Sequence, residues 1–149
     1  AINFADLQSE QHYRPMVAYG QSKLANLMFA FELQRRSDAA GWGLASSAAH
    51  PGISRTDLIP NGAGRNSPMA LMRRLLGPIL FQAPAQGALP TLFAATSPQA
   101  KAGAYYGPDK FNELRGSPVV AKVPPQAEDE LVAARLWDMS AALAGVTFS

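Results

Sequence analysis

A long helical pattern near the start of the chain most constrains its fold. Apolar side chains recur at the i, i+3, i+4, i+7 spacing of a helix face at Leu24, Leu27, Met28 and Phe31. A second stripe runs along another side of the same segment through Asn26, Phe29, Ala30 and Leu33. The pattern predicts a helix from about Val17 to Arg36. A helix that is apolar on two sides is usually buried on two sides, so we expect it to pack on a sheet and on a second helix or subunit. The polar residues Glu32, Gln34, Arg35 and Arg36 indicate its solvent-exposed end.

The remaining segments alternate between strand-like and helix-like stretches. A strand is predicted at 44–50, although its alanines are unfavourable there, and another at 103–108. Further helices are predicted to begin at Ser67-Pro68 and to span 85–96 and 126–143, with Gly145 as the C-cap of the last. A loop or extended segment is expected at 1–18, a long loop at 53–66 and a proline-rich connector at 116–125. This order indicates part of an α/β protein with about two strands and four helices.

The composition excludes several classes of protein. The 149 residues favour one domain, and with 48% hydrophobic and 16% charged residues the chain is not disordered. The absence of cysteine excludes a disulfide scaffold and fits a reducing, cytoplasmic location. A net charge of +2 is too balanced to indicate nucleic-acid binding, and two histidines without cysteine do not indicate a metal site. No apolar stretch approaches the roughly 20 residues of a membrane span.

Tyr19 and Lys23 form the first candidate for chemistry. Residues four apart in a helix share a face, so the phenol and the ammonium are expected to lie together. A nearby positive charge favours the phenolate, which lets a tyrosine give and take a proton beside a carbonyl or alcohol. Taken alone, the pair fits an ordinary helix face equally well.

The second candidate is the turn His50-Pro51-Gly52, with Thr56 just beyond it. It follows the predicted strand 44–50, and ligands of open α/β sheets bind beyond the carboxyl ends of strands. A Pro-Gly turn also ends strands that bind nothing, and taken alone this is the favoured interpretation. His50 is then expected to be a hydrogen-bonded residue at the strand end.

Together the two candidates resemble the active site of the short-chain dehydrogenase/reductase family. The family's Tyr-x-x-x-Lys motif matches Tyr19-Gly20-Gln21-Ser22-Lys23. Retinol-dehydrogenase-like members are the most similar, through Ile2 to Leu7, Leu24-Ala25-Asn26, His50-Pro51-Gly52 and Thr56-Asp57-Leu58. The resemblance runs along nearly the whole chain. It implies a Rossmann-like doubly wound parallel sheet, with residues 1–149 as the C-terminal portion of a single reductase domain.

The resemblance also implies roles for individual residues. Tyr19 would be the catalytic acid/base, and Lys23 would lower its pKa and bind the nicotinamide ribose hydroxyls. Both residues would thus belong to the catalytic and to the cofactor-binding set. The other cofactor-binding residues would be Pro51, Gly52 and Ile53 along the nicotinamide and Thr56 at its carboxamide or a phosphate. Residues 58–82 would be a variable substrate-binding lid, and no metal is implied. The helix that carries Tyr19 would join a homodimer or homotetramer interface.

The family's glycine-rich dinucleotide fingerprint has no counterpart in the sequence, and its catalytic serine belongs upstream of Ile2. The chain begins with Ala1, so we expect the C-terminal half of a longer reductase that is inactive in isolation. The expected activity is hydride transfer between NADP or NAD, with NADP favoured, and a small lipophilic alcohol or carbonyl. The alternatives are a non-catalytic nucleotide-sensing or interaction protein of the same fold, and a mature 149-residue protein with a binding role.

Overall fold

The computed structural model describes residues 1–52 and 82–147. The chain divides into two compact units, Ala1–Ser47 with Lys122–Ser149, and Ala48–Ala121. The helix predicted to begin at Ser67-Pro68, and the predicted lid apart from its last residue, lie outside the described residues.

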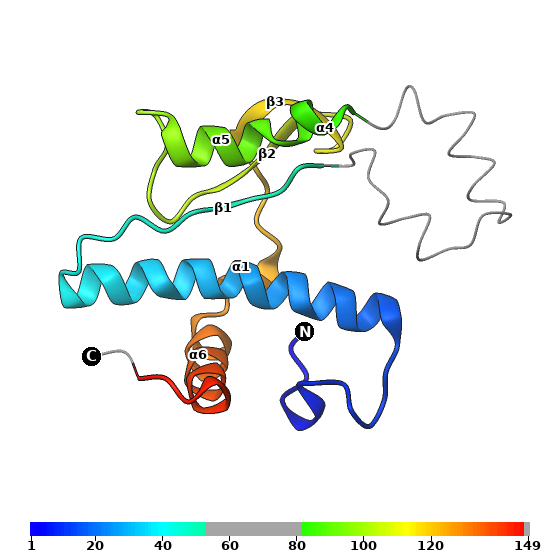
Figure 1. Cartoon of the computed structure of the whole chain (residues 1–149), viewed down its shortest axis with the longest axis vertical. Coiled ribbons are helices and arrows are strands. Elements are labelled where there is room, and N and C mark those ends of the chain that lie inside the picture. The colour runs from blue at the N-terminus through cyan, green and yellow to red at the C-terminus, as the bar shows by residue number, and fades with distance from the viewer. Residues whose placement is uncertain (53–81, 148–149) are drawn as a thin grey trace, which may run out of the picture. The chain divides into compact units, whose positions relative to one another are not determined.

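The first unit is built on α1, which spans Pro15–Ala40 (Figure 1). It is unbroken, so the helix predicted from Val17 to Arg36 is confirmed and extends beyond both predicted ends. Pro15 occupies its first turn, where the missing N–H is no loss. Gly41 ends it with a φ of 66°, a left-handed conformation that favours glycine.

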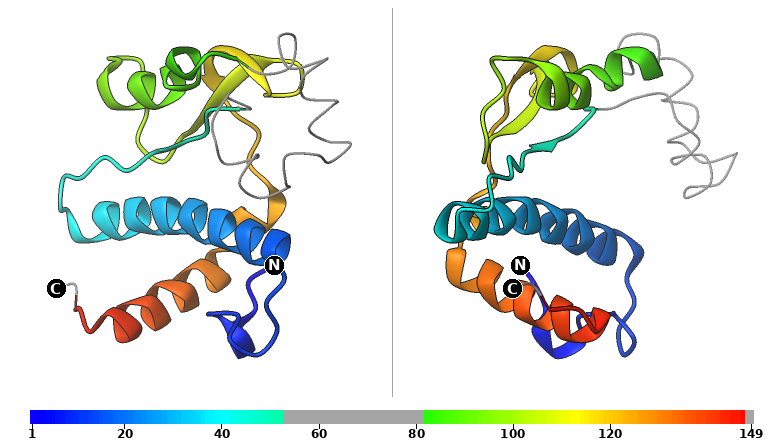
Figure 2. Two further views of the ribbon diagram at one scale, coloured as in Figure 1. Left: turned by 45° about the vertical axis from the view of Figure 1, so that its right-hand side comes forward. Right: turned by 60° about the vertical axis from the view of Figure 1, so that its left-hand side comes forward.

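The second helix of this unit is α6, which spans Glu130–Ala144 and packs against α1 (Figure 2). Between them the rings of Phe29 and Trp137 stack, with centroids 5.2 Å apart and an angle of 8° between the planes. Met28 is fully buried and Leu27 nearly so. On the side of α1 that carries Phe29, the doubled apolar stripe therefore packs on a second helix, as predicted.

The polar end of α1 is more buried than the sequence predicts. Glu32 is 6% exposed and Gln34 is 8% exposed, so the expected solvent-facing end is wrong for these two residues. Glu32 pairs with Arg35 and Arg36, each at 2.7 Å. Gln34 accepts a hydrogen bond from the backbone N–H of Ser46 at 2.7 Å. These partners explain the difference, since polar groups can be buried when they are hydrogen-bonded.

The N-terminal segment, expected to be a loop, contains a short 3₁₀ helix, η1, over Phe4–Asp6. Removal from water opposes ionisation of Asp6, but hydrogen bonds from the backbone N–H groups of Gln11, His12 and Glu10 outweigh it, and the pKa of the carboxyl is lowered. A lowered pKa in the folded state means that this turn is stabilised above the unfolded-state pKa of the carboxyl. That stabilisation is lost as the pH falls through the folded-state pKa.

The last helix begins later than the predicted residue 126. A 3₁₀ turn, η2, occupies Pro125–Glu128, and the Asp129 carboxylate then accepts a hydrogen bond from Val132 N at 3.0 Å. Asp129 is thus the N-cap of α6. At the other end, the predicted cap Gly145 is confirmed, with a φ of 66°.

Replacing Asp129 with alanine should lower the free energy of unfolding by about 1 kcal/mol, because the Val132 N–H loses its partner. Asparagine at the same position should retain most of the stability, since its side-chain oxygen also caps. Urea unfolding of the natural protein checks this, with Glu128→Ala as a control on a neighbouring exposed carboxylate. An Asp129→Ala variant as stable as the Asn variant would contradict the cap.

The second unit contains a three-stranded sheet in the order β1-β2-β3 (Figures 1 and 2). β1 (Ala48–Ala49) pairs in parallel with β2 (Tyr105–Lys110), and β2 pairs antiparallel with β3 (Arg115–Val120). The helices α4 (Pro84–Gly87) and α5 (Leu89–Thr96) lie between β1 and β2 in the chain. Strands joined through helices pair in parallel in this way in α/β proteins, so the predicted class is confirmed.

Three details of this unit correct the sequence predictions. The strand expected at 44–50 is assigned over two residues only, although His50 N still donates to Tyr106 O at 2.9 Å. The connector expected at 116–125 contains β3, whose Pro118 is tolerated because this is an edge strand of the described sheet. The helix expected at 85–96 is divided into α4 and α5, and Pro90 lies in the first turn of α5, where a proline is accepted.

Candidate active site

Tyr19 and Lys23 lie on one face of α1, as their spacing predicts. The Lys23 ammonium is 5.4 Å from the centroid of the Tyr19 ring. Tyr19 is 46% exposed and Lys23 is exposed, so both can reach a ligand. The Ser22 hydroxyl donates to the Tyr19 carbonyl at 2.8 Å, within the helix turn that joins the pair. The arrangement places a phenol and a cation beside each other at the surface of this unit.

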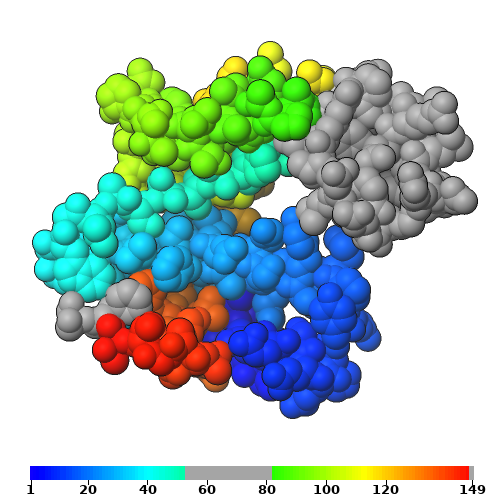
Figure 3. All heavy atoms as spheres, viewed as in Figure 1, coloured from blue at the N-terminus to red at the C-terminus, as the bar shows by residue number. Residues whose placement is uncertain are grey.

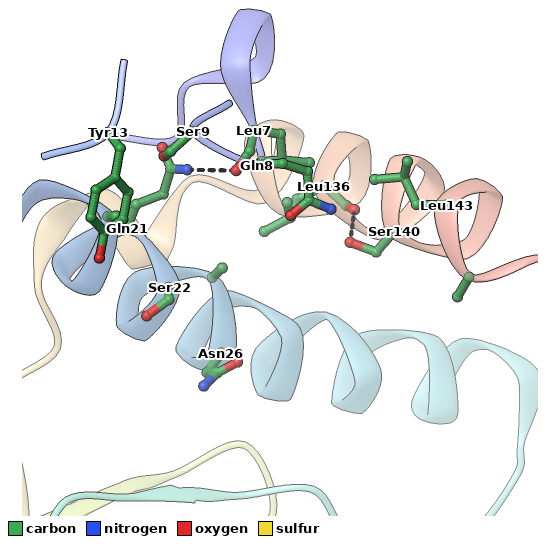
Figure 4. Close-up of a pocket in the computed structure, with 13 residues that line it drawn as sticks. Leu7, Gln8, Ser9, Tyr13, Gln21, Ser22, Asn26, Leu136, Ser140 and Leu143 are labelled. Atoms are coloured by element: carbon green, nitrogen blue, oxygen red, sulfur yellow. Dashed lines mark hydrogen bonds between the residues drawn. The ribbon is translucent and has the colours of Figure 1, made fainter. Parts of the chain in front are cut away.

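Gln21, which lies between the two residues in sequence, fastens the N-terminal segment to this turn of α1. Its side-chain carbonyl accepts from Asn3 N at 2.8 Å, and its amide donates to the Leu7 carbonyl at 3.1 Å (Figure 4). Sequence reasoning gave Gln21 no role. Its two bonds reach back 14 and 18 residues, which no local pattern predicts.

A cavity of about 590 Å³ opens between the N-terminal segment, α1 and α6 (Figure 4). In Figure 3 the N-terminal segment lies beside α6 on the surface of this unit. The lining of the cavity is mainly apolar and includes Leu7, Tyr13, Leu136 and Leu143. Tyr19 and Lys23 are not among the lining residues. The position of this cavity therefore differs from that of the predicted catalytic pair.

The Pro51–Gly52 turn follows β1 in the second unit. Gly52 has a φ of 66°, and a Cβ there would collide with the backbone carbonyl of Leu114. Only glycine fits without strain. The Gly52 N–H donates to Nδ1 of His50 at 3.3 Å, so the interpretation of His50 as a hydrogen-bonded residue at the strand end is confirmed.

The His50 ring is enclosed by the β2–β3 hairpin. Its Nε2 lies 3.3 Å from a carboxylate oxygen of Glu113 but forms no hydrogen bond with the described residues, so the two groups are close without hydrogen-bond geometry. The ring centroid is 5.1 Å from that of Tyr105, and Gly107 leaves the space that Nε2 occupies. Burial, and then the negative charge of Glu113, raise the pKa of the Tyr105 hydroxyl. Tyr105 therefore stays protonated at neutral pH.

Gln82 is a residue of this site that sequence reasoning missed. It was expected to end the variable lid, yet it is 4% exposed and lies within the sheet unit. Its amide donates to the Pro51 carbonyl at 2.5 Å, and its side-chain carbonyl accepts from Gly116 N at 3.3 Å. A single glutamine before Ala83-Pro84 carries no periodicity, so the sequence held no signal for it.

The six predicted site residues are thus distributed unevenly. Tyr19 and Lys23 lie in the first unit, and Pro51 and Gly52 in the second. The remaining two, Ile53 and Thr56, lie outside the described residues. Within residues 1–52 and 82–147 no group of three or more His, Asp or Glu side chains could hold a metal ion.

Comparison with known proteins identifies relatives of this chain. No family model matches the chain. Retinol dehydrogenase 14 of Mus musculus is 38% identical over 151 residues, covering 97% of this chain and 40% of the relative. A short chain dehydrogenase/reductase, dpchH, of Colletotrichum higginsianum is 37% identical over 124 residues, covering 83% and 29%. Polyprenol dehydrogenase of Homo sapiens is 32% identical over 146 residues, covering 97% and 41%. Over nearly its whole length the chain thus matches part of proteins of the short-chain dehydrogenase/reductase family.

A solved structure shows the same fold. The crystal structure of an uncharacterized protein from Mycobacterium paratuberculosis is 35% identical, with a TM-score of 0.74, and covers 100% of this chain and 47% of that one. The fold is thus the predicted Rossmann-like α/β fold. The chain spans about 40% of the length of the retinol dehydrogenases that it matches. Among the helices that the structure describes, none is both long and apolar enough to cross a membrane.

Proposed function

We propose that the protein that carries this chain is an NAD(P)-dependent oxidoreductase that interconverts an alcohol and its carbonyl. The observation that carries the proposal is the contact between Tyr19 and Lys23 on the exposed face of α1, at the family's Tyr-x-x-x-Lys spacing. The named relatives are dehydrogenases and reductases, which supports oxidoreduction as the reaction class.

Tyr19 is proposed as the general acid/base. In carbonyl reduction its hydroxyl donates the proton to the substrate oxygen, and in alcohol oxidation the phenolate accepts it. The Lys23 ammonium beside the ring offers donors to sugar hydroxyls. A nicotinamide, when bound, supplies or accepts the hydride.

The described residues fit the nicotinamide end of such a cofactor. Lys23 and Tyr19 are exposed enough to bind ribose hydroxyls. Pro51, Gly52, Ile53 and Thr56 are proposed to complete this part of the site. NADP is proposed over NAD on the resemblance to retinol-dehydrogenase-like members. A homodimer or homotetramer and a cytoplasmic location belong to the same proposal.

The proposed substrates are lipophilic alcohols and aldehydes, because retinol and polyprenol name the relatives' substrates. The test is consumption of NADPH or NADH by the natural full-length protein with retinal, with a polyprenal and with acetaldehyde. We expect turnover with the apolar aldehydes and NADPH, and little with acetaldehyde. Cofactor binding without turnover on any aldehyde would instead favour the non-catalytic alternative.

A further inference from the structure

One peptide group of the second unit is held at both of its polar atoms by side chains. The Pro51 carbonyl accepts from the Gln82 amide, and the N–H of the same peptide, on Gly52, donates to Nδ1 of His50. A peptide group is planar, so hydrogen bonds at both its oxygen and its N–H restrict rotation of the whole plane. The turn is thus held in one orientation by two side chains.

Each of the two side chains is itself anchored to the β2–β3 hairpin. Gln82 is buried and accepts from Gly116 N in β3. His50 lies against Tyr105 and Gly107 of β2, with Nε2 facing Glu113 in the hairpin loop. Because Nδ1 accepts a hydrogen bond, the neutral ring carries its proton on Nε2. The hairpin therefore determines the rotamer of both side chains.

We propose that Gln82 and His50 are positioning residues that orient the Pro51–Gly52 peptide for binding of the nicotinamide. The inference rests on the proposed function, in which this turn lies along the nicotinamide. Neither side chain needs to touch the cofactor. Each acts through the orientation of the Pro51–Gly52 peptide plane.

The test separates binding of the nicotinamide from stability of the fold. In the natural full-length protein, affinity is measured by calorimetry for NADP⁺ and for 2′-phospho-ADP-ribose, which lacks the nicotinamide; NAD⁺ and ADP-ribose form the parallel pair. Gln82→Glu keeps the acceptor for Gly116 N but cannot donate to the Pro51 carbonyl while ionised. We expect its affinity for NADP⁺ to fall roughly tenfold, as for loss of one hydrogen bond. Its affinity for 2′-phospho-ADP-ribose should be unchanged.

The control is Gln86→Glu, the same change at an exposed position in α4. It should leave both affinities unchanged. His50 is tested by rescue: His50→Asn retains an acceptor near the position of Nδ1, whereas His50→Phe retains a ring without one. The Asn variant should bind NADP⁺ more tightly than the Phe variant, with thermal unfolding recorded for each.

Three results would overturn the inference. Gln82→Glu could bind NADP⁺ as tightly as the unsubstituted protein. It could lose both ligands equally, which would indicate a role in folding alone. His50→Asn could show no advantage over His50→Phe. If the unsubstituted protein binds NADP⁺ and NAD⁺ no more tightly than their fragments that lack nicotinamide, the proposed function fails and the inference fails with it.

Discussion

Replacing Tyr19 with phenylalanine is expected to lower turnover by about 10²–10⁴-fold, the usual contribution of a general acid/base. The change removes one hydroxyl from a side chain that is 46% exposed, so little packing is lost. The ring against which Lys23 lies is retained, and nicotinamide affinity should therefore persist. Steady-state turnover of the natural full-length protein and separate titration of the cofactor measure the two effects.

The matched control for this variant is Tyr13→Phe. Tyr13 is 69% exposed, precedes α1 and lines the cavity beside α6, to which neither Tyr19 nor Lys23 contributes. Its loss of a hydroxyl should leave turnover within a factor of about two, as expected of an exposed group outside the site. Near-normal turnover in Tyr19→Phe would show that the proton comes from another group, and the assignment of the site would fail.

The largest effect on stability is expected at Trp137. This side chain is 5% exposed, stacks on Phe29 of α1, and lies 4.8 Å from the guanidinium of Arg36. Truncation to alanine leaves a cavity between α1 and α6, and such changes cost about 3–5 kcal/mol. Trp137→Phe should cost clearly less, because a ring still stacks on Phe29. Urea unfolding of the natural protein measures both.

Leu131→Ala provides the comparison on the same helix. Leu131 is 85% exposed, so its truncation should change the free energy of unfolding by less than about 0.5 kcal/mol. An alanine at 137 no more harmful than the alanine at 131 would contradict the packing of α6 on α1. Trp137 meets α1 at Phe29 and Arg36, more than two helical turns from Tyr19, so its destabilised variant should retain turnover at low temperature.

Local spacing predicted the parts of the molecule that depend on a single helix. The period of apolar residues predicted α1, and the separation of four residues predicted that Tyr19 and Lys23 share a face. Gly145 was predicted as a cap because a helix end needs a left-handed residue, which is also a local requirement. The motif and the Pro-Gly turn together were enough to indicate the family.

Features made by residues far apart in the chain were missed. Hydropathy predicted that Glu32 and Gln34 face solvent, because it records polarity and not whether a partner will be present. The sequence predicts a connector in place of β3 because its proline and glycine are poor strand formers, and only pairing with β2 makes the segment a strand.

The candidate site also combines features that local sequence predicts with features that only distant residues create. The sequence by itself determined which residues are candidates for proton transfer and for cofactor binding, because both predictions depend on residue types at short spacing. Only the tertiary structure decided how that turn is held: Gln82 reaches Pro51 across 31 residues and Gly116 across 34. A buried amide must find partners wherever the fold presents them, and those partners are specified by the packing of the sheet rather than by any neighbouring residue.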